Sequence, residues 1–255
     1  MRIENIDNGN SFDFGKTSAE YAKYRDIYPK ELYDKLYEIG IGHKGCSWLD
    51  IGTGTGVLPL NMYYYGADIK AIDISRSQIA AAKILAEEKD ADNIEISVSP
   101  AEKTPFEDNS FDCITAAHCF WYFDREKIIS EIKRLLKPDG IFVKIYMSYT
   151  LDDEIAKSSH ELVKKINTSW TPGASGAKDM YNHPFENGQL DIFECKLPFT
   201  RESWHGRMLA CRGTKASMDK ERLNEWEKAH LDLLSQYPEE FEIKHKIYIA
   251  SYKTL

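Results

Sequence analysis

The chain has 255 residues, of which 42% are hydrophobic and 29% charged, a composition typical of globular proteins that excludes a disordered or fibrous chain. The net charge of −8 repels phosphate backbones, so we expect no nucleic-acid partner. No apolar run reaches the roughly 20 residues of a membrane helix, and the first ten residues hold no apolar signal stretch, which predicts a cytoplasmic protein without a membrane partner. The five cysteines form no CxxC pair, which favours reduced thiols and no metal site.

Strand and helix patterns alternate through the first 150 residues. The predicted elements are a helix at 28–39, a strand at 47–51, a helix at 57–65, a strand at 69–72, a helix at 78–89, strands at 94–98 and 111–116, a helix at 125–137, a Pro-Asp-Gly turn at 138–140 and a strand at 141–146. Strands that alternate with helices pair in parallel, so this order predicts an α/β fold with a doubly wound, Rossmann-like sheet.

The pattern changes after residue 150. It predicts a helix at 152–167, a loop containing Gly, Pro and Ser at 168–188, a strand at 190–199, helices at 202–212 and 220–236, and a strand at 241–253. These helices fall between the last two strands, and we expect them to form a cap over the carboxyl edge of the sheet, where open α/β sheets bind ligands.

The strongest local motif is Leu49–Gly56, LDIGTGTG, in which a strand leads into glycines at the start of a helix. Glycines there let a ligand approach the backbone closely. A dinucleotide fingerprint requires a glycine where this chain has Val57 and does not require Asp50. Asp73 ends the next strand, where a carboxylate can accept both hydroxyls of a ribose, so the motif indicates an adenosine ligand. The alternative is a tight turn beside an ordinary surface aspartate.

These motifs resemble the class I S-adenosylmethionine-dependent methyltransferases, in particular the small-molecule branch that includes trans-aconitate methyltransferase-like proteins (methyltransferase type 11). The resemblance covers residues 12–147. It rests on the glycine loop at 50–56, Asp73, PAEKTPF at 100–106, FDCITAA at 111–117 and LKPDG at 136–140. It implies S-adenosyl-L-methionine as the cofactor and a small molecule as the methyl acceptor.

The resemblance also implies a cofactor site. Backbone groups around Gly52 hold the methionine part, Asp73 binds the ribose, Ile74 packs on the adenine, and an aromatic residue and an arginine of an amino-terminal lid close over the amino-acid end. The residues implied for cofactor binding are Tyr21, Arg25, Asp50, Gly52, Thr53, Gly54, Gly56, Asp73, Ile74, Ala101, Glu102 and Ala117.

On the acceptor side, the motif places His118 beside the methyl group, which makes it the candidate general base, with a packing or hydrogen-bonding role as the alternative. Candidate acceptor-binding residues are Tyr24, Trp121, Tyr122, Trp170, Tyr181, Trp204 and Arg207. Aromatic rings enclose a planar or apolar acceptor and arginine pairs with an acid, whereas the alternatives are core packing and a solvated helix face. Relatives read AAQAFHWF where this chain reads AAHCFWYF at 116–123, so the family does not identify the acceptor.

We therefore expect one methyltransferase domain over residues 1–255, with a seven-stranded sheet whose last strand is antiparallel. Residues 1–40 form the lid and first helix, 41–150 the cofactor-binding core and 151–240 the cap. The expected activity is methylation of a small metabolite, at a carboxylate or hydroxyl oxygen, by a monomer or homodimer. The alternatives are a non-catalytic binding module for an adenosine ligand and a nicotinamide-dependent oxidoreductase, against which Val57 and the lack of a Tyr-x-x-x-Lys set argue.

Overall fold

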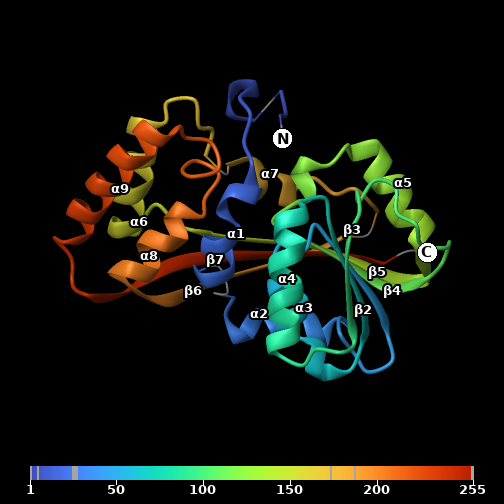
Figure 1. The fold of residues 1–255 in the computed structure, drawn as a ribbon. Helices are drawn as coiled ribbons and strands as arrows, with labels where there is room; N and C mark the ends of the chain where they lie inside the picture. Colours follow the sequence, from blue (N-terminus) through green and yellow to red (C-terminus); the bar gives the residue numbers. More distant parts are fainter. Residues whose placement is uncertain (1, 5, 25–27, 173, 187, 254–255) are drawn as a thin grey trace. The chain divides into compact units, whose positions relative to one another are not determined.

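The computed structural model describes residues 2–4, 6–24, 28–172, 174–186 and 188–253 (Figure 1). Its seven-stranded sheet has the order β3-β2-β1-β4-β5-β7-β6. The strands are β1 (Ser47–Ile51), β2 (Asp68–Asp73), β3 (Ile94–Val98), β4 (Phe111–Ala117), β5 (Leu136–Tyr149), β6 (Gln189–Thr200) and β7 (Glu240–Lys253). Strands β1 to β5 pair in parallel, and the last strands are antiparallel, which confirms the predicted Rossmann-like sheet.

Seven of the helices follow the predicted order with different ends, whereas α1 and α7 were not predicted. They are α1 (Ser18–Tyr24), α2 (Lys30–Glu38), α3 (Val57–Leu60), α4 (Arg76–Glu88), α5 (Arg125–Leu135), α6 (Glu154–Ile166), α7 (Ala174–Met180), α8 (Arg201–Leu209) and α9 (Lys220–Leu234). Among the described helices, none has the length and apolar character that a membrane crossing requires.

Contacts divide the chain into two compact units. The first comprises residues 1–27, 148–174 and 194–246, and the second comprises 28–147, 175–193 and 247–255. The first 27 residues of the predicted lid thus share a unit with most of the predicted cap. The remainder of the lid range, with α2, belongs to the second unit.

The second unit carries helices on both faces of its parallel strands. Neighbouring residues of a strand point to opposite faces, and Ala71 and Ile72 of β2 follow this rule. Ala71 packs with Ile79 of α4, whereas Ile72 belongs to the large apolar cluster that includes Ile132 of α5. Both β2 residues are fully buried, as expected for a strand that helices cover on both sides.

Three local predictions differ from the structure. The turn at 138–140 is a bulge within β5, because Phe111 pairs with Leu136 while Cys113 pairs with Ile141. The predicted helix at 57–65 ends at Leu60 and is followed by a separate 3₁₀ turn, Tyr63–Tyr65. The predicted loop at 168–188 also contains α7.

In the first unit, a buried polar network joins three helices. Ser159 Oγ of α6 donates to the Ile155 carbonyl at 2.8 Å and accepts from Trp204 Nε1 of α8 at 3.0 Å. Because the only hydroxyl proton of Ser159 is donated to Ile155, His230 Nε2 of α9 must be the donor in its 3.0 Å hydrogen bond with Ser159 Oγ. His230 Nδ1 is then the acceptor in its 2.9 Å bond with His205 Nδ1. The network requires a neutral His230.

Candidate functional site

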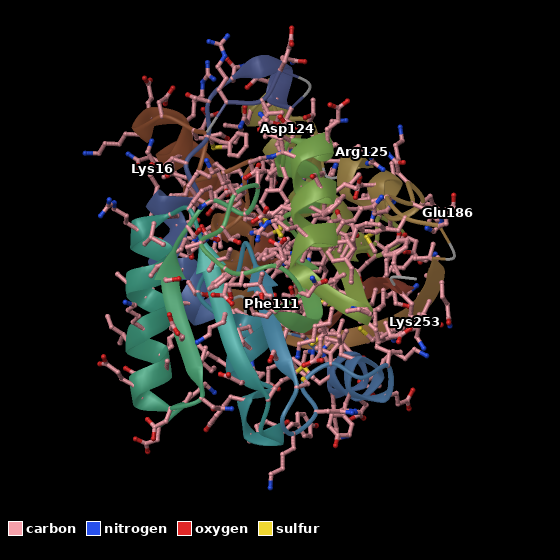
Figure 2. All side chains as sticks on the ribbon, turned by 90° about the vertical axis from the view of Figure 1, so that its right-hand side faces the viewer. Lys16, Phe111, Asp124, Arg125, Glu186 and Lys253 are labelled. Atoms are coloured by element: carbon pink, nitrogen blue, oxygen red, sulfur yellow. The ribbon has the colours of Figure 1, made fainter. Side chains whose placement is uncertain are left out.

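The carboxyl ends of β1, β2, β3 and β4 bring most of the predicted cofactor residues to one edge of the second unit. Chain order runs outward from β1 to β3 on one side and from β4 to β5 on the other, so the winding reverses between β1 and β4. Open α/β sheets bind ligands at such a reversal. Figure 2 shows Phe111, which begins β4, and Asp124, beyond its carboxyl end, at opposite ends of this part of the sheet.

The glycine loop and the segment that follows β4 touch at this reversal. Gly52 has φ +64°, and a Cβ at this position would lie 2.7 Å from Cys119 Sγ, so no side chain fits without movement. Cys119 Sγ donates to the Ile51 carbonyl at 3.1 Å. The positive φ angles of Gly54 and Gly56 continue the turn into α3. Glycine is thus required here for both the backbone angle and the contact.

Asp73 connects the glycine loop to the start of α4. One carboxylate oxygen accepts the Gly54 N–H at 2.9 Å, and the other accepts the Ser75 N–H at 2.8 Å. Burial raises the pKa of Asp73, while these N–H groups and that of Ile74 oppose the rise. Each carboxylate oxygen retains further acceptor capacity, so this bonding is compatible with the ribose contact implied by the resemblance.

Asp50 occupies the interior of the same edge. Its side chain is buried, and Oδ1 accepts a 2.6 Å hydrogen bond from Thr115 Oγ1, which in turn accepts from Trp48 Nε1 at 2.8 Å. Burial raises the pKa of Asp50 to about 6, although the Thr115 and Thr53 hydroxyls oppose this effect. Asp50 is therefore a buried anchor beneath the loop, and Thr53 is buried beside it.

The predicted adenine contacts differ in accessibility. Ile74, which follows Asp73, is 62% exposed, an unusual position for a large apolar side chain and one that offers a flat ring a surface to pack on. Ala101 is buried. Glu102 is half-buried, and its Oε1 accepts the Asp124 N–H at 3.2 Å.

His118 follows β4 in a left-handed conformation, with φ +58°. Its backbone N–H donates to the Ile145 carbonyl at 2.9 Å, and its ring Nε2 accepts the Met147 N–H at 3.1 Å. Since Nε2 is the acceptor, the neutral ring carries its proton on Nδ1. His118 was predicted to act as a general base. Proton uptake at Nε2 would break the hydrogen bond from the Met147 N–H, so this bond opposes that role.

Aromatic side chains surround His118 in the second unit. Tyr28 stacks on its ring at 6.1 Å, and Tyr146 lies 5.1 Å away. Trp121 packs edge-on against Tyr146 at 5.2 Å and lies 5.4 Å from Tyr122. Half-buried Ala117 precedes His118 at the end of β4. The structure thus brings two predicted acceptor residues next to the predicted methyl position.

Tyr181, also in the second unit, is 58% exposed and packs edge-on against Tyr248 at 6.3 Å; Tyr248 in turn contacts Tyr146. Tyr28 and Tyr248, which contact His118 and Tyr146, were not among the predicted site residues. Tyr28 precedes a helix-starting proline and Tyr248 lies in the last strand, and neither position carries a functional motif.

The remaining predicted residues belong to the first unit. Tyr24 Oη donates to Glu202 at 2.9 Å, and its ring lies against α8 at Gly206, where a Cβ would fall 2.3 Å from a ring carbon. Trp170 packs on His160 at 4.9 Å. Arg25 lies outside the described residues, and only the backbone of Tyr21, in α1, is described.

Trp204 and Arg207, two predicted acceptor residues on α8, are both buried. Trp204 is fully buried and bonded to Ser159, so it packs in the core, and its predicted contact with the acceptor stays a prediction. Arg207, for which a solvated helix face was the alternative, is 4% exposed. Neither degree of burial follows from the local sequence, because α8 has only a weak apolar stripe.

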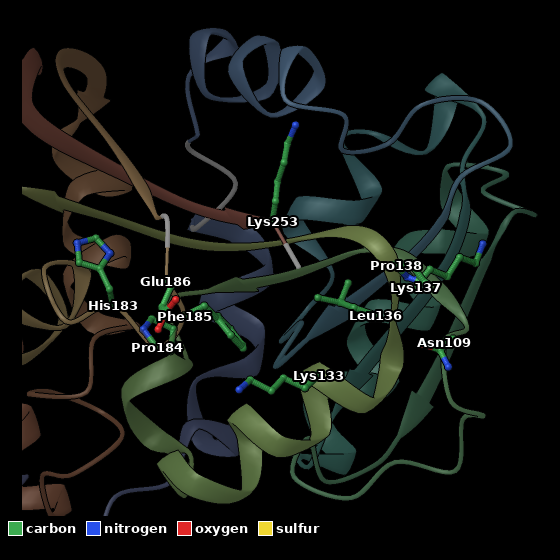
Figure 3. Close-up of a pocket in the computed structure, with 10 residues that line it drawn as sticks. All are labelled: Asn109, Lys133, Leu136, Lys137, Pro138, His183, Pro184, Phe185, Glu186 and Lys253. Atoms are coloured by element: carbon green, nitrogen blue, oxygen red, sulfur yellow. The ribbon is translucent and has the colours of Figure 1, made fainter. Parts of the chain in front are cut away.

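A pocket of about 680 Å³ lies at the other edge of the second unit (Figure 3). Leu136 begins β5 and Lys253 ends the antiparallel β7, so both mark the edge opposite to the glycine loop. None of the predicted site residues whose side chains the structure describes lines this pocket, whose walls include Lys133, Lys137, His183 and Phe185. Within the described ranges, no three His, Cys, Asp or Glu side chains gather as metal ligands do.

Comparisons with known proteins agree with this geometry. A family profile described as a methyltransferase domain matches residues 49–144. The chain is 30% identical over 179 residues to the uncharacterized methyltransferase YcgJ of Bacillus subtilis, a match that covers 68% of each protein. Two further curated methyltransferases match over a smaller share of their length. The chain covers 63% of one and 50% of the other.

Two solved structures are similar in fold. The crystal structure of YcgJ has a TM-score of 0.56 at 21% identity, over 89% of this chain and all of that one. A Haemonchus contortus phosphoethanolamine N-methyltransferase 2, solved with phosphomonomethylethanolamine and S-adenosylhomocysteine, has a TM-score of 0.50 at 20% identity, over 87% of this chain and 52% of that one.

Proposed function

Because the chain belongs to the class I S-adenosylmethionine-dependent methyltransferases, we propose that it transfers the methyl group of S-adenosyl-L-methionine to a small organic molecule. The observation that carries the proposal is the contact between the glycine loop and the segment after β4, with Asp73 fixing the loop. This contact lies at the reversal of the sheet, where ligands of this fold class bind.

The residues at this edge fit the cofactor. Side-chain-free backbone at Gly52 and Gly54 suits the methionine part, the Asp73 carboxylate suits a ribose, and the exposed face of Ile74 suits an adenine. The buried Thr55 hydroxyl in the same loop has no hydrogen-bond partner among the described residues, so the loop retains an unused polar group. Ala101 and Glu102 remain proposed contacts at this edge, and the contacts predicted for Tyr21 and Arg25 stay predictions.

When bound, S-adenosyl-L-methionine supplies an activated methyl group on a sulfonium, so the protein mainly provides proximity and orientation. The aromatic side chains around His118 suit this task, because rings attract a cation and enclose an acceptor in a dry pocket. We assign Trp121, Tyr122 and Tyr181 to the acceptor side. The acceptor contacts predicted for Tyr24 and Trp170, which belong to the first unit, stay predictions.

The bonding of His118 favours a carboxylate oxygen over a hydroxyl oxygen as the atom methylated. A hydroxyl acceptor loses a proton during transfer and benefits from a base, whereas a carboxylate does not. His118 holds its Nε2 on the Met147 N–H, and this bond opposes proton uptake there. In this proposal His118 positions the segment after β4 and does not remove a proton.

Calorimetric titration of the protein with S-adenosylhomocysteine, beside NADH, tests the proposal before any acceptor is known. We expect micromolar binding of S-adenosylhomocysteine and no binding of NADH. Preference for NADH would contradict the proposal and support the oxidoreductase alternative. Binding without turnover across a panel of carboxylic acids, phenols and amines would support the non-catalytic binding module.

A further inference from the structure

We propose that the first unit binds the carboxylate of a small organic acid on the guanidinium of Arg207. This arginine lies on α8 and is 4% exposed. All the residues that carry the proposal, Tyr149, His160, Trp204, Arg207 and Cys211, belong to this unit. Binding of the acid does not require the cofactor. The inference rests on the proposed function in one respect, that the acid is the methyl acceptor.

The guanidinium of Arg207 has incomplete bonding for a buried cation. One Nη donates to Cys211 Sγ at 2.8 Å, a neutral and weak acceptor. Nε is buried and bonds to no acceptor in the part of the chain that the structure describes. Across the same ranges, no Asp or Glu oxygen lies within 4.0 Å of this side chain, whereas most of the other arginines described do have such a partner.

Arg212 provides an internal comparison within the same unit. It is 8% exposed, its Nε lies 3.3 Å from the buried carboxylate of Asp7, and another guanidinium nitrogen donates to the Thr171 carbonyl. Residues 7 and 212 are far apart in sequence, so the fold brings a carboxylate to one buried arginine and none to the other. A buried ion without a counterion costs several kcal/mol. A bound anion removes this cost at Arg207.

The geometry indicates a carboxylate attached to an apolar or aromatic body. Nε and the neighbouring Nη of an arginine form a fork that matches the two oxygens of a carboxylate. The carbon of the Arg207 guanidinium lies 5.3 Å from the ring centre of Tyr149 and 5.7 Å from that of Trp204, so aromatic surfaces border the fork. An apolar body attached to the carboxylate would pack on the half-buried ring of Tyr149.

The polar groups beside Arg207 are neutral, so its positive charge is the main attraction for an anion. Tyr149 Oη lies 3.1 Å from His160 Nδ1, and burial lowers the pKa of His160, so this histidine is neutral at pH 7. His160 also packs on Trp170, which extends the aromatic surface. The site therefore combines one fixed positive charge with rings and neutral polar groups.

The test measures melting temperature and calorimetric binding on the full chain at pH 7. The probes are sodium benzoate and sodium phenylacetate, their neutral amides benzamide and phenylacetamide, and inorganic phosphate. We expect both carboxylates to raise the melting temperature at millimolar concentration, and the amides and phosphate to have no effect. Equal shifts with acid and amide, a larger effect of phosphate, or no shift with either carboxylate would overturn the proposal.

Three variants locate the effect. Arg207→Met removes the charge and should abolish the carboxylate shift, without lowering the melting temperature of the unliganded protein, because an uncompensated charge has been removed. Arg207→Lys keeps a charge but loses the fork, and should weaken benzoate at least tenfold. Arg222→Met, at a half-exposed site on α9 beside Asp219, is the matched control and should keep the shift.

A carboxylate shift that persists in Arg207→Met would contradict the assignment to this residue. So would a carboxylate shift that disappears equally in Arg222→Met. Titration of the wild-type protein with S-adenosylhomocysteine is carried out separately, so a failure of cofactor binding is distinguished from a failure of acid binding.

Discussion

Replacement of Gly52 by alanine tests whether the glycine loop and the segment after β4 form one rigid contact. The new Cβ would lie 2.7 Å from Cys119 Sγ, 2.8 Å from Cys119 Cβ and 3.4 Å from a ring carbon of Phe123. The alanine would also adopt φ +64°, which costs roughly 1–2 kcal/mol for a residue with a Cβ. Overpacking of a buried contact adds about 1–3 kcal/mol. We expect Gly52→Ala to lower the free energy of unfolding by ~2–5 kcal/mol in total.

Gly45 provides a matched control, because it has φ +81° and no atom within 4 Å of its added Cβ. Gly45→Ala has the backbone cost alone, ~1–2 kcal/mol. Urea unfolding of the two variants isolates the steric part as their difference. Calorimetry with S-adenosylhomocysteine should show loss of affinity in Gly52→Ala and wild-type affinity in Gly45→Ala. Equal destabilisation of the two variants, or full cofactor affinity in Gly52→Ala, would refute the reasoning.

Three further variants extend the test. Asp73→Ala should weaken S-adenosylhomocysteine by ~1–3 kcal/mol in calorimetry, the cost of losing hydrogen bonds to a ligand and the loop; unchanged affinity would contradict the ribose contact. His118→Asn, which tolerates φ +58° but removes the ring that accepts the Met147 N–H, should lower turnover at least tenfold at unchanged cofactor affinity, and a wild-type rate would contradict the positioning role. Burial and then His205 lower the pKa of His230 to about 3, so the folded protein favours neutral His230. Stability is therefore complete above pH 6.5 and falls as the pH drops towards 3, by about 2 kcal/mol at pH 5. Urea unfolding of His230→Gln at pH 7 and 5 should show a smaller loss, and an equal loss would contradict this assignment.

The parallel strands and their edge are predictable from sequence because their signals are local. Each strand is a short apolar run, and the LDIGTGTG motif and Asp73 mark where two of these runs end. Parallel pairing then brings all the carboxyl ends to one edge, so the order of the chain is enough to group these residues.

Burial and bonding at the same site depend on long-range contacts that no local pattern reveals. The Met147 N–H that occupies His118 comes from β5, a strand whose bulge displaces the register by several residues. Trp204 and Arg207 lie on a short helix with mixed polarity, and only tertiary packing makes one a core residue and the other a buried cation. The contact of Tyr24 with Gly206 likewise joins residues 182 positions apart.

Hydrogen exchange of the full chain with and without S-adenosylhomocysteine tests most directly the claim that the cofactor binds at the reversal of the sheet. Protection should increase in the glycine loop at 50–56, at 73–75 and at 117–119, where backbone groups form the proposed site. Amides around Lys133, Lys137 and 183–186, which border the pocket at the opposite edge, should not change. Protection confined to that pocket, with none in the glycine loop, would contradict the account.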